Sequence, residues 1–134
     1  MSHKQKGSRA ERELFHFLWD KGWAVLRVAG SGSTSMPAPD LLAGNRNRFL
    51  AIECKSLKKK TQYLERQQMN ELKEFAEHFG AEPWVGVRFD NIGWYFLPLS
   101  EIPDEGNKSL SVSLEFAKSK GLNLESFSDS ERKG

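Results

Sequence analysis

Apolar residues recur along the chain with two different periods, and the change of period predicts the order of helices and strands. Residues 8–22 and 64–79 carry apolar side chains at helical spacing, and each segment stops at a glycine, Gly22 or Gly80. Shorter apolar runs bounded by turn residues predict five strands, at residues 23–28, 40–43, 48–55, 84–89 and 94–97. This order predicts an α/β fold with a central mixed five-stranded sheet flanked by helices.

The pattern is weaker beyond Pro103. Residues 109–114 alternate like a strand, whereas residues 114–120 have the pattern of a helix and precede Gly121. We favour a short helix in this region. The last residues, from about 129 to 134, are expected to fray.

The length of 134 residues predicts a single domain. We expect a core of about residues 7–98, followed by a C-terminal extension of about residues 99–128. No apolar run is long enough to span a membrane, and the first residues lack the apolar stretch of a signal peptide. The single cysteine, Cys54, excludes an internal disulfide and fits a reducing compartment, so we expect a cytoplasmic protein without a membrane partner.

A predicted hairpin brings the most informative polar residues together. Gly44 and Asn45 form a turn signal between apolar runs, so the chain is expected to fold back there and to place Asp40 beside Glu53. Because side chains alternate along a strand, Glu53 and Lys55 point to the same face. Two carboxylates and one ammonium group therefore converge at one edge of the sheet.

These groups have the chemistry to hold a hard divalent cation against a phosphate and to leave a lysine beside an attacking water. The alternative is a half-buried hairpin with a surface ion pair, which a single E-x-K sequence on a strand does not exclude. The complete pattern resembles the motif of the PD-(D/E)-x-K nuclease superfamily in Asp40, Glu53 and Lys55. The resemblance implies a metal-dependent nuclease with the restriction-endonuclease-like fold.

Glu11 is a third acid, and it lies on an apolar helix face. It precedes Leu14 and Leu18 by three and seven residues, which places it in the middle of the apolar stripe of the first helix. A carboxylate on an inward face is costly without a partner. One alternative is a capping box, in which Glu11 reaches back to the backbone of Ser8. We favour the other interpretation, in which Glu11 projects towards the first two carboxylates as a third oxygen ligand.

The net charge of +2 is uninformative, but the charge is unevenly distributed. Residues 1–73 carry 14 Lys/Arg against 7 Asp/Glu, whereas residues 74–134 carry 6 against 11. A basic half that also holds the three acids fits an enzyme that acts on a polyanion. Chance asymmetry of solvated faces is the alternative.

A longer set of motifs narrows the resemblance to the archaeal Holliday junction resolvases. The likeness covers roughly residues 5–98 and comprises Gly7-x-x-x-Glu11-Arg12-Glu13-Leu14, Arg27-Val28-Ala29-Gly30-Ser31, Pro39-Asp40-x-x-Ala43-Gly44-Asn45, Ile52-Glu53-x-Lys55, Lys58-Lys59-Lys60, Phe75-x-x-x-Phe79-Gly80 and Gly93-Trp94-x-Phe96. The chain departs from many relatives in a longer serine-rich stretch before Asp40. That departure makes the role of Ser33 less certain than that of Ser31.

The resemblance implies a structure-selective, homodimeric endodeoxyribonuclease. Such an enzyme cuts two opposed strands of a four-way DNA junction by paired symmetric nicks in homologous recombination and repair, and it leaves 5′-phosphates. Mg²⁺, for which Mn²⁺ would substitute, would be held by Glu11, Asp40, Glu53 and the backbone carbonyl of Cys54. Lys55 would orient or deprotonate the attacking water, and Ser31 would contact the phosphate at the cut.

Further residues are expected to contact the DNA. They are Arg9, Arg12, Arg27, Ser33, Lys58, Lys59 and Lys60. The three lysines lie in a polar connection expected at residues 56–62. A lysine run on a loop is often only solvated, but this run is tethered close to Lys55.

The dimer interface is expected on the second helix and on the strand around Trp94. Residues 94–97 are apolar on both faces of their strand, and a large uncovered apolar patch marks an interface. The interface residues would be Phe75, Phe79, Trp94 and Phe96. The alternative for this strand is complete burial in the centre of the sheet.

Two other functions stay open at this point. One is another nuclease of the same superfamily, acting on linear duplex DNA. The other is a non-catalytic DNA-binding module that keeps the fold. Nothing in the chain resembles a base-reading helix or a zinc finger, so junction shape is a better target than base sequence.

Overall fold

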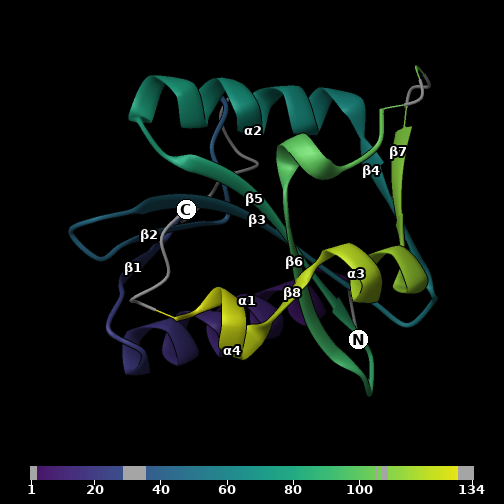
Figure 1. Cartoon of the computed structure of the whole chain (residues 1–134), viewed down its shortest axis with the longest axis horizontal. Helices are drawn as coiled ribbons and strands as arrows, with labels where there is room; N and C mark the ends of the chain where they lie inside the picture. Colours follow the sequence, from purple (N-terminus) through teal and green to yellow (C-terminus); the bar gives the residue numbers. More distant parts are fainter. Residues whose placement is uncertain (1–2, 29–35, 105, 107–108, 130–134) are drawn as a thin grey trace.

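The computed structural model describes residues 3–28, 36–104, 106 and 109–129, and for residues 3–8 the backbone alone. Its main element is a six-stranded sheet in the order β1-β2-β3-β5-β6-β8 (Figure 1). The elements are α1 (His3–Asp20), β1 (Ala24–Arg27), β2 (Leu41–Gly44), β3 (Phe49–Leu57), β4 (Thr61–Glu65), α2 (Arg66–Phe79), β5 (Glu82–Phe89), β6 (Gly93–Pro98), a 3-10 turn (Leu99–Glu101), β7 (Ser109–Ser113), α3 (Leu114–Lys120), β8 (Leu122–Asn123) and α4 (Leu124–Phe127).

The sheet is mixed, as predicted. Strands β1, β2 and β3 are antiparallel neighbours, β3 and β5 are parallel, and β5, β6 and β8 are antiparallel. The parallel pair requires a crossover, which β4 and α2 provide. The predicted α/β class is confirmed. The sheet has one strand more than predicted, because the two-residue β8 pairs with the edge of β6.

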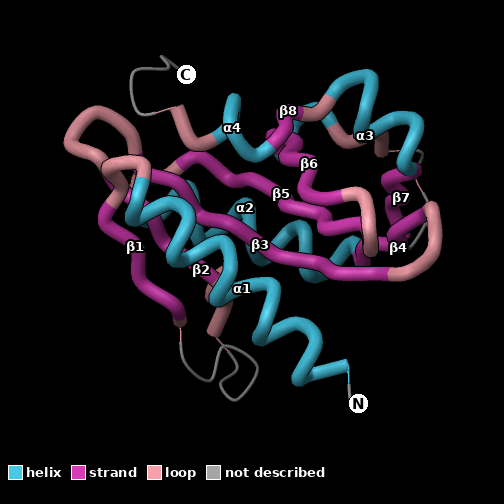
Figure 2. The backbone as a smooth tube through the Cα atoms, turned by 90° about the horizontal axis from the view of Figure 1, so that it is seen from below, coloured by secondary structure: helices cyan, strands magenta, loops and turns pink. Residues whose placement is uncertain are grey.

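Helices cover both faces of the sheet. α2 lies on one face, and α1 and α4 lie on the other (Figures 1 and 2). The buried positions recur at helical spacing and are Ala10, Leu14 and Leu18 in α1 and Met69, Leu72 and Ala76 in α2. The result is two apolar clusters, one on each side of the sheet. Within the described part of the chain, no helix is both long and apolar enough to cross a membrane.

The segment after β6 packs into both clusters. β7 forms a separate two-stranded sheet with β4, and the side chain of Ser113 then caps α3 by accepting a hydrogen bond from the backbone N–H of Phe116 (3.0 Å). The helix favoured from the sequence is therefore present, and the strand-like pattern before it is a strand. Phe127 of α4 stacks on Phe96 of β6, with ring centroids 3.9 Å apart.

Element boundaries differ from the predictions at three main places. α2 begins at Arg66 rather than at residue 64, because residues 64 and 65 belong to β4, a strand that was not predicted. α1 begins at His3 rather than at Ser8. The lysine-rich connection is shorter than predicted, because β3 continues to Leu57, which pairs with Phe89 of β5, and β4 starts at Thr61. Of the predicted frayed tail, residues 130–134 lie outside the described residues.

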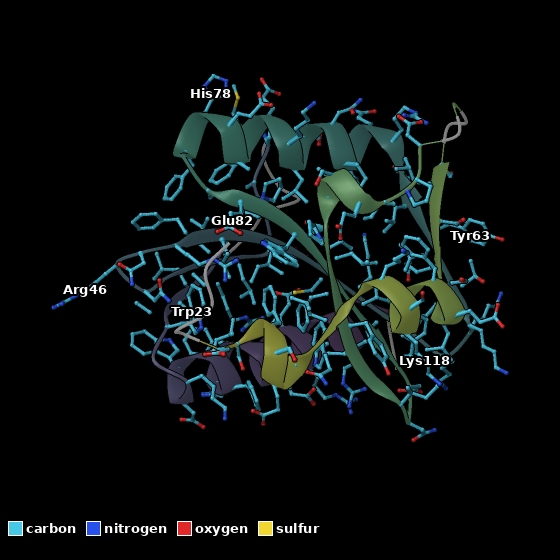
Figure 3. The ribbon with its side chains drawn as sticks, viewed as in Figure 1. Trp23, Arg46, Tyr63, His78, Glu82 and Lys118 are labelled. Atoms are coloured by element: carbon cyan, nitrogen blue, oxygen red, sulfur yellow. The ribbon has the colours of Figure 1, made fainter. Side chains whose placement is uncertain are left out.

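Strand β4 lies at one end of the molecule, and the turn that joins β2 to β3 lies at the opposite end. In Figure 3, Arg46 at the tip of that turn points away on one side, and Tyr63 of β4 points away on the other. Arg48, which follows the turn, is buried and donates two hydrogen bonds to Glu82 of β5 (2.8 and 2.7 Å). This ion pair ties the hairpin to the start of β5.

Candidate active site

The hairpin of β2 and β3 fixes the position of Asp40. Leu41 pairs with Ile52, so Asp40 enters the sheet beside Glu53. The backbone N–H of Asp40 donates to the carbonyl of Ile52 (3.1 Å), and Oδ2 of Asp40 accepts a hydrogen bond from the backbone N–H of Cys54 (2.8 Å). The predicted hairpin and its register are confirmed, and the Asp40 carboxylate is anchored to β3.

Glu53 and Lys55 share one face of β3, as strand alternation predicts. Nζ of Lys55 lies 3.7 Å from Oε2 of Glu53, and their side chains are 23% and 16% exposed. Lys55 has a second contact, because its Nζ donates to Oε1 of Gln68 in α2 (3.1 Å). The ammonium group is therefore held between β3 and α2.

Glu11 reaches this region from α1. Its side chain is 22% exposed, and its Oε1 accepts a 3.4 Å hydrogen bond from Nη2 of Arg27. Burial raises the pKa of Glu11, and the charge of Asp40 adds to the rise, so the two carboxylates interact. Ser8 lies inside α1, which begins at His3, and therefore cannot be the N-cap. The capping-box alternative is excluded by this helix start.

The three carboxylates hold protons more firmly than isolated ones do. Burial raises the pKa of Glu53 to about 8, and the negative charge of Asp40 adds to the rise. Burial also raises the pKa of Asp40, against the hydrogen bond from the Cys54 backbone, and it raises the pKa of Glu11. Buried carboxylates that repel one another are stabilised by a cation placed between them, so the cluster has the electrostatics of a functional site.

The donor chemistry fits a hard divalent cation. The groups are carboxylate oxygens with a backbone carbonyl close by, and these are the ligands that Mg²⁺ prefers. In the part of the chain that the structure describes, no three His, Cys, Asp or Glu side chains are gathered closely enough to form a complete metal site. Mg²⁺ commonly binds through one or two carboxylates and retains several waters, and the pair of Asp40 and Glu53 suits that mode.

The residues predicted to contact the DNA lie on several elements. Arg27 contacts Glu11, whereas Arg9 and Arg12 are exposed on α1. The lysines at positions 58–60 are exposed in the turn that directly follows β3. Ser31 and Ser33 lie outside the described residues.

The predicted dimer interface is wrong for two of its four residues. Trp94 and Phe96 are 4% and 0% exposed, because α1 and α4 cover this part of the sheet. The indole N–H of Trp94 donates to Glu13 of α1 (2.7 Å). Phe79 of α2 is 54% exposed and stacks on the half-buried Phe75, so these two residues do reach the surface.

The contacts of two polar residues, Gln68 and Glu13, could not be predicted from the sequence pattern. Gln68 is one of two adjacent glutamines on a polar helix face, and nothing in the pattern distinguishes it from Gln67. Glu13 accepts hydrogen bonds from Arg88 (3.0 Å) and Trp94 (2.7 Å), which joins α1 to the hairpin of β5 and β6. Such a contact depends on how a helix crosses a sheet, which periodicity does not specify.

The groups of Asp40, Glu53 and Lys55 lie within the sheet rather than at its edge as predicted, because Glu53 and Lys55 belong to β3, which pairs with both β2 and β5. An α/β sheet with Asp40 at the start of β2 beside Glu53 and Lys55 of β3 defines a nuclease of the PD-(D/E)-x-K class. The bacterial homing endonuclease I-Ssp6803I shares the fold, with a TM-score of 0.55 and 17% sequence identity over 83% of this chain and 73% of that one. The model of the archaeal Holliday junction resolvase family (Hjc) matches residues 2–133. This chain therefore belongs to that family.

Individual relatives agree with the family model. The crossover junction endodeoxyribonuclease Hjc of Archaeoglobus fulgidus is 44% identical over 96 residues, which cover 72% of this chain and 71% of that protein. The Hjc of Methanocaldococcus jannaschii is 38% identical over 91 residues, 67% of this chain and 65% of that protein. The solved structure of the A. fulgidus Hjc matches with a TM-score of 0.83 and 34% identity over 91% of this chain and 99% of that one.

Proposed function

We propose that this chain is an endodeoxyribonuclease that resolves four-way DNA junctions in homologous recombination and repair, acting in the cytoplasm. It makes paired symmetric nicks in opposed strands and leaves 5′-phosphates. The observation that carries the proposal is the convergence of Asp40, Glu53 and Lys55 around the interior strand β3, inside a chain of the resolvase family.

A divalent cation is required, and we propose that it is Mg²⁺, with Mn²⁺ as a substitute. The ligands of the cation would be the carboxylates of Asp40 and Glu53 and the backbone carbonyl of Cys54. Glu11 would complete the ligand set. When bound, the cation polarises the scissile phosphate and lowers the pKa of a water. The carboxylates supply the negative charge that keeps the cation in place.

Lys55 has the position to act on the attacking water. Its ammonium lies on the same strand face as Glu53 and is only partly exposed, so it can orient the water and stabilise negative charge that develops on the phosphate. Ser31 is proposed to contact the phosphate at the cut. Arg9, Arg12, Arg27 and Ser33 are proposed to bind neighbouring phosphates.

Paired cuts at symmetric positions call for two active sites related by a two-fold axis, and so for a homodimer. An open apolar surface beside α2 supports this assembly. Leu26 of β1 and Phe49 of β3 are 67% and 49% exposed, and strand alternation places both on the side of the sheet that faces α2. α2 itself packs over β3 and β5. We propose that the interface joins this surface, with Phe75 and Phe79, to its copy in a second subunit.

Replacing Lys58, Lys59 and Lys60 by alanine is expected to weaken junction binding and to make its salt dependence shallower, by a slope of about 0.9 for each phosphate that the variant no longer neutralises. The three side chains are exposed, so stability should hardly change. Fluorescence anisotropy at a series of salt concentrations, in a Glu53→Gln background that does not cut the DNA, measures the slope.

Lys21→Ala provides the control for this measurement. Lys21 is an exposed lysine that precedes β1, at the end of the sheet where β3 begins. The turn of Lys58, Lys59 and Lys60 instead follows the end of β3. Removal of the Lys21 side chain should leave the slope unchanged. An unchanged slope in the triple variant as well would identify the turn as merely solvated.

The proposed function is tested with a labelled four-way junction. In Mg²⁺ the wild-type protein should produce two symmetric nicks whose ends DNA ligase can reseal, which shows 5′-phosphates. Chelation should abolish the reaction, and Ca²⁺ should not restore it. Cleavage in the presence of a chelator, or products that ligase cannot reseal, would contradict the mechanism.

A further inference from the structure

The ammonium group of Lys55 has two oxygen partners, and only one of them belongs to the carboxylate cluster. Nζ lies 3.7 Å from Oε2 of Glu53 but 3.1 Å from Oε1 of Gln68. The shorter contact is the hydrogen bond to the amide, and it comes from a different element, the first turns of α2. The position of Lys55 is therefore set by α2 as well as by its own strand.

We propose that Gln68 is a positioning residue for Lys55, and that its amide oxygen holds the ammonium group beside the attacking water during phosphodiester cleavage. The inference rests on the proposed function of this site. It assigns to Gln68 no contact with the DNA and no contact with the cation.

The chemistry of the two partners explains why the second one is needed. Glu53 is proposed to hold a divalent cation. A carboxylate whose charge is neutralised by a bound cation attracts the ammonium group of Lys55 less strongly. A lysine carries four rotatable side-chain bonds and loses its place when its only partner is withdrawn. Gln68 is a neutral acceptor, so it directs the ammonium without competing for the cation and without adding a further negative charge to the cluster.

The surroundings of Gln68 argue against a role in stability. Its side chain is exposed, and its amide makes no second hydrogen bond within the described residues. The buried positions of α2 are Met69, Leu72 and Ala76, so Gln68 is not part of the apolar face of the helix. A residue in this place contributes little to folding.

Gln68→Met removes the acceptor and keeps the length of the side chain, and Gln67→Met is the matched control on the same helix. Single-turnover cleavage of a four-way junction with enzyme in excess is measured together with the junction Kd. We expect Gln68→Met to cut about tenfold more slowly, less than the effect of losing a positioned proton-transfer group outright. The Kd and the Tm should match those of the wild type, and Gln67→Met should cut like the wild type.

A double-mutant cycle with Lys55→Met separates positioning from other roles. If Gln68 acts only through Lys55, adding Gln68→Met to Lys55→Met should change the remaining rate by less than about twofold. An equal loss in both backgrounds, or a wild-type rate for Gln68→Met, would overturn the inference. A wild-type protein that does not cut junctions at all would instead refute the proposed function, so the two failures are distinguishable.

Discussion

Asp40→Asn and Glu53→Gln are expected to reduce the rate of junction cleavage by at least about 10²-fold each, as the removal of a main electrostatic element of an active site does. Both substitutions keep the size of the side chain and remove the negative charge that would hold the cation. Glu11→Gln should cause a loss of the same order, because the charges of Glu11 and Asp40 interact. Single-turnover rates in Mg²⁺ measure all three.

Binding provides the comparison for these variants. Junction affinity comes mainly from phosphate contacts elsewhere on the surface, so the Kd should change little. Glu125→Gln is a control in which an exposed carboxylate of α4 is neutralised outside the cluster, and it should cut normally. If folded Glu11→Gln protein cleaves at the wild-type rate, Glu11 is only an ion-pair partner of Arg27 and not a ligand. If Asp40→Asn or Glu53→Gln cleaves at the wild-type rate, the proposed metal site is wrong.

Phe75→Glu and Phe79→Glu are expected to give folded monomers that no longer make paired cuts. A carboxylate introduced at the centre of an apolar interface must be desolvated without a partner, which opposes association. Phe79 is already 54% exposed in the single chain, so its replacement should leave the fold intact. Sedimentation velocity measures the assembly, and a junction carried in a supercoiled plasmid distinguishes paired cuts, which linearise it, from single nicks.

Ile92→Glu is the control for sedimentation. Ile92 is 49% exposed in the turn between β5 and β6, away from α2, and a charge there should leave the dimer intact. A wild-type chain that sediments as a monomer at micromolar concentration and still linearises the plasmid would exclude the proposed dimer.

The hairpin and its two carboxylates could be predicted from the sequence because their determinants are local. Oδ1 of Asn45 accepts hydrogen bonds from the backbone N–H groups of Asn47 (3.2 Å) and Arg48 (2.9 Å), and Arg46 adopts a left-handed φ of 82°. A few adjacent residues thus specify the turn. Once the turn is placed, strand alternation determines which side chains share a face.

The error at Trp94 and Phe96 has a non-local cause. An apolar strand that a distant helix covers has the same pattern as one that a second subunit covers. Here Phe127 stacks on Phe96, and Glu13 accepts a hydrogen bond from the indole N–H of Trp94. Both residues that cover this strand therefore belong to elements remote in sequence. The short β8 and α4 carried too few residues for periodicity to show them.

Gln68 could not be predicted for a related reason. Its contact with Lys55 depends on the placement of α2 over β3, and it makes no apolar contact that leaves a trace in the sequence pattern. The sequence predicts which groups share a strand, but it does not predict which polar residue of a crossing helix meets them.

The central claim is that this active site acts on branched DNA. The most direct measurement compares single-turnover cleavage of a four-way junction with cleavage of the four duplexes that form its arms, at equal concentration in Mg²⁺. The account predicts symmetric cuts in two opposed strands of the junction and no detectable cleavage of the duplexes. Cleavage of the duplexes at the rate of the junction would contradict it, and would make the chain a nuclease of linear DNA built on the same site.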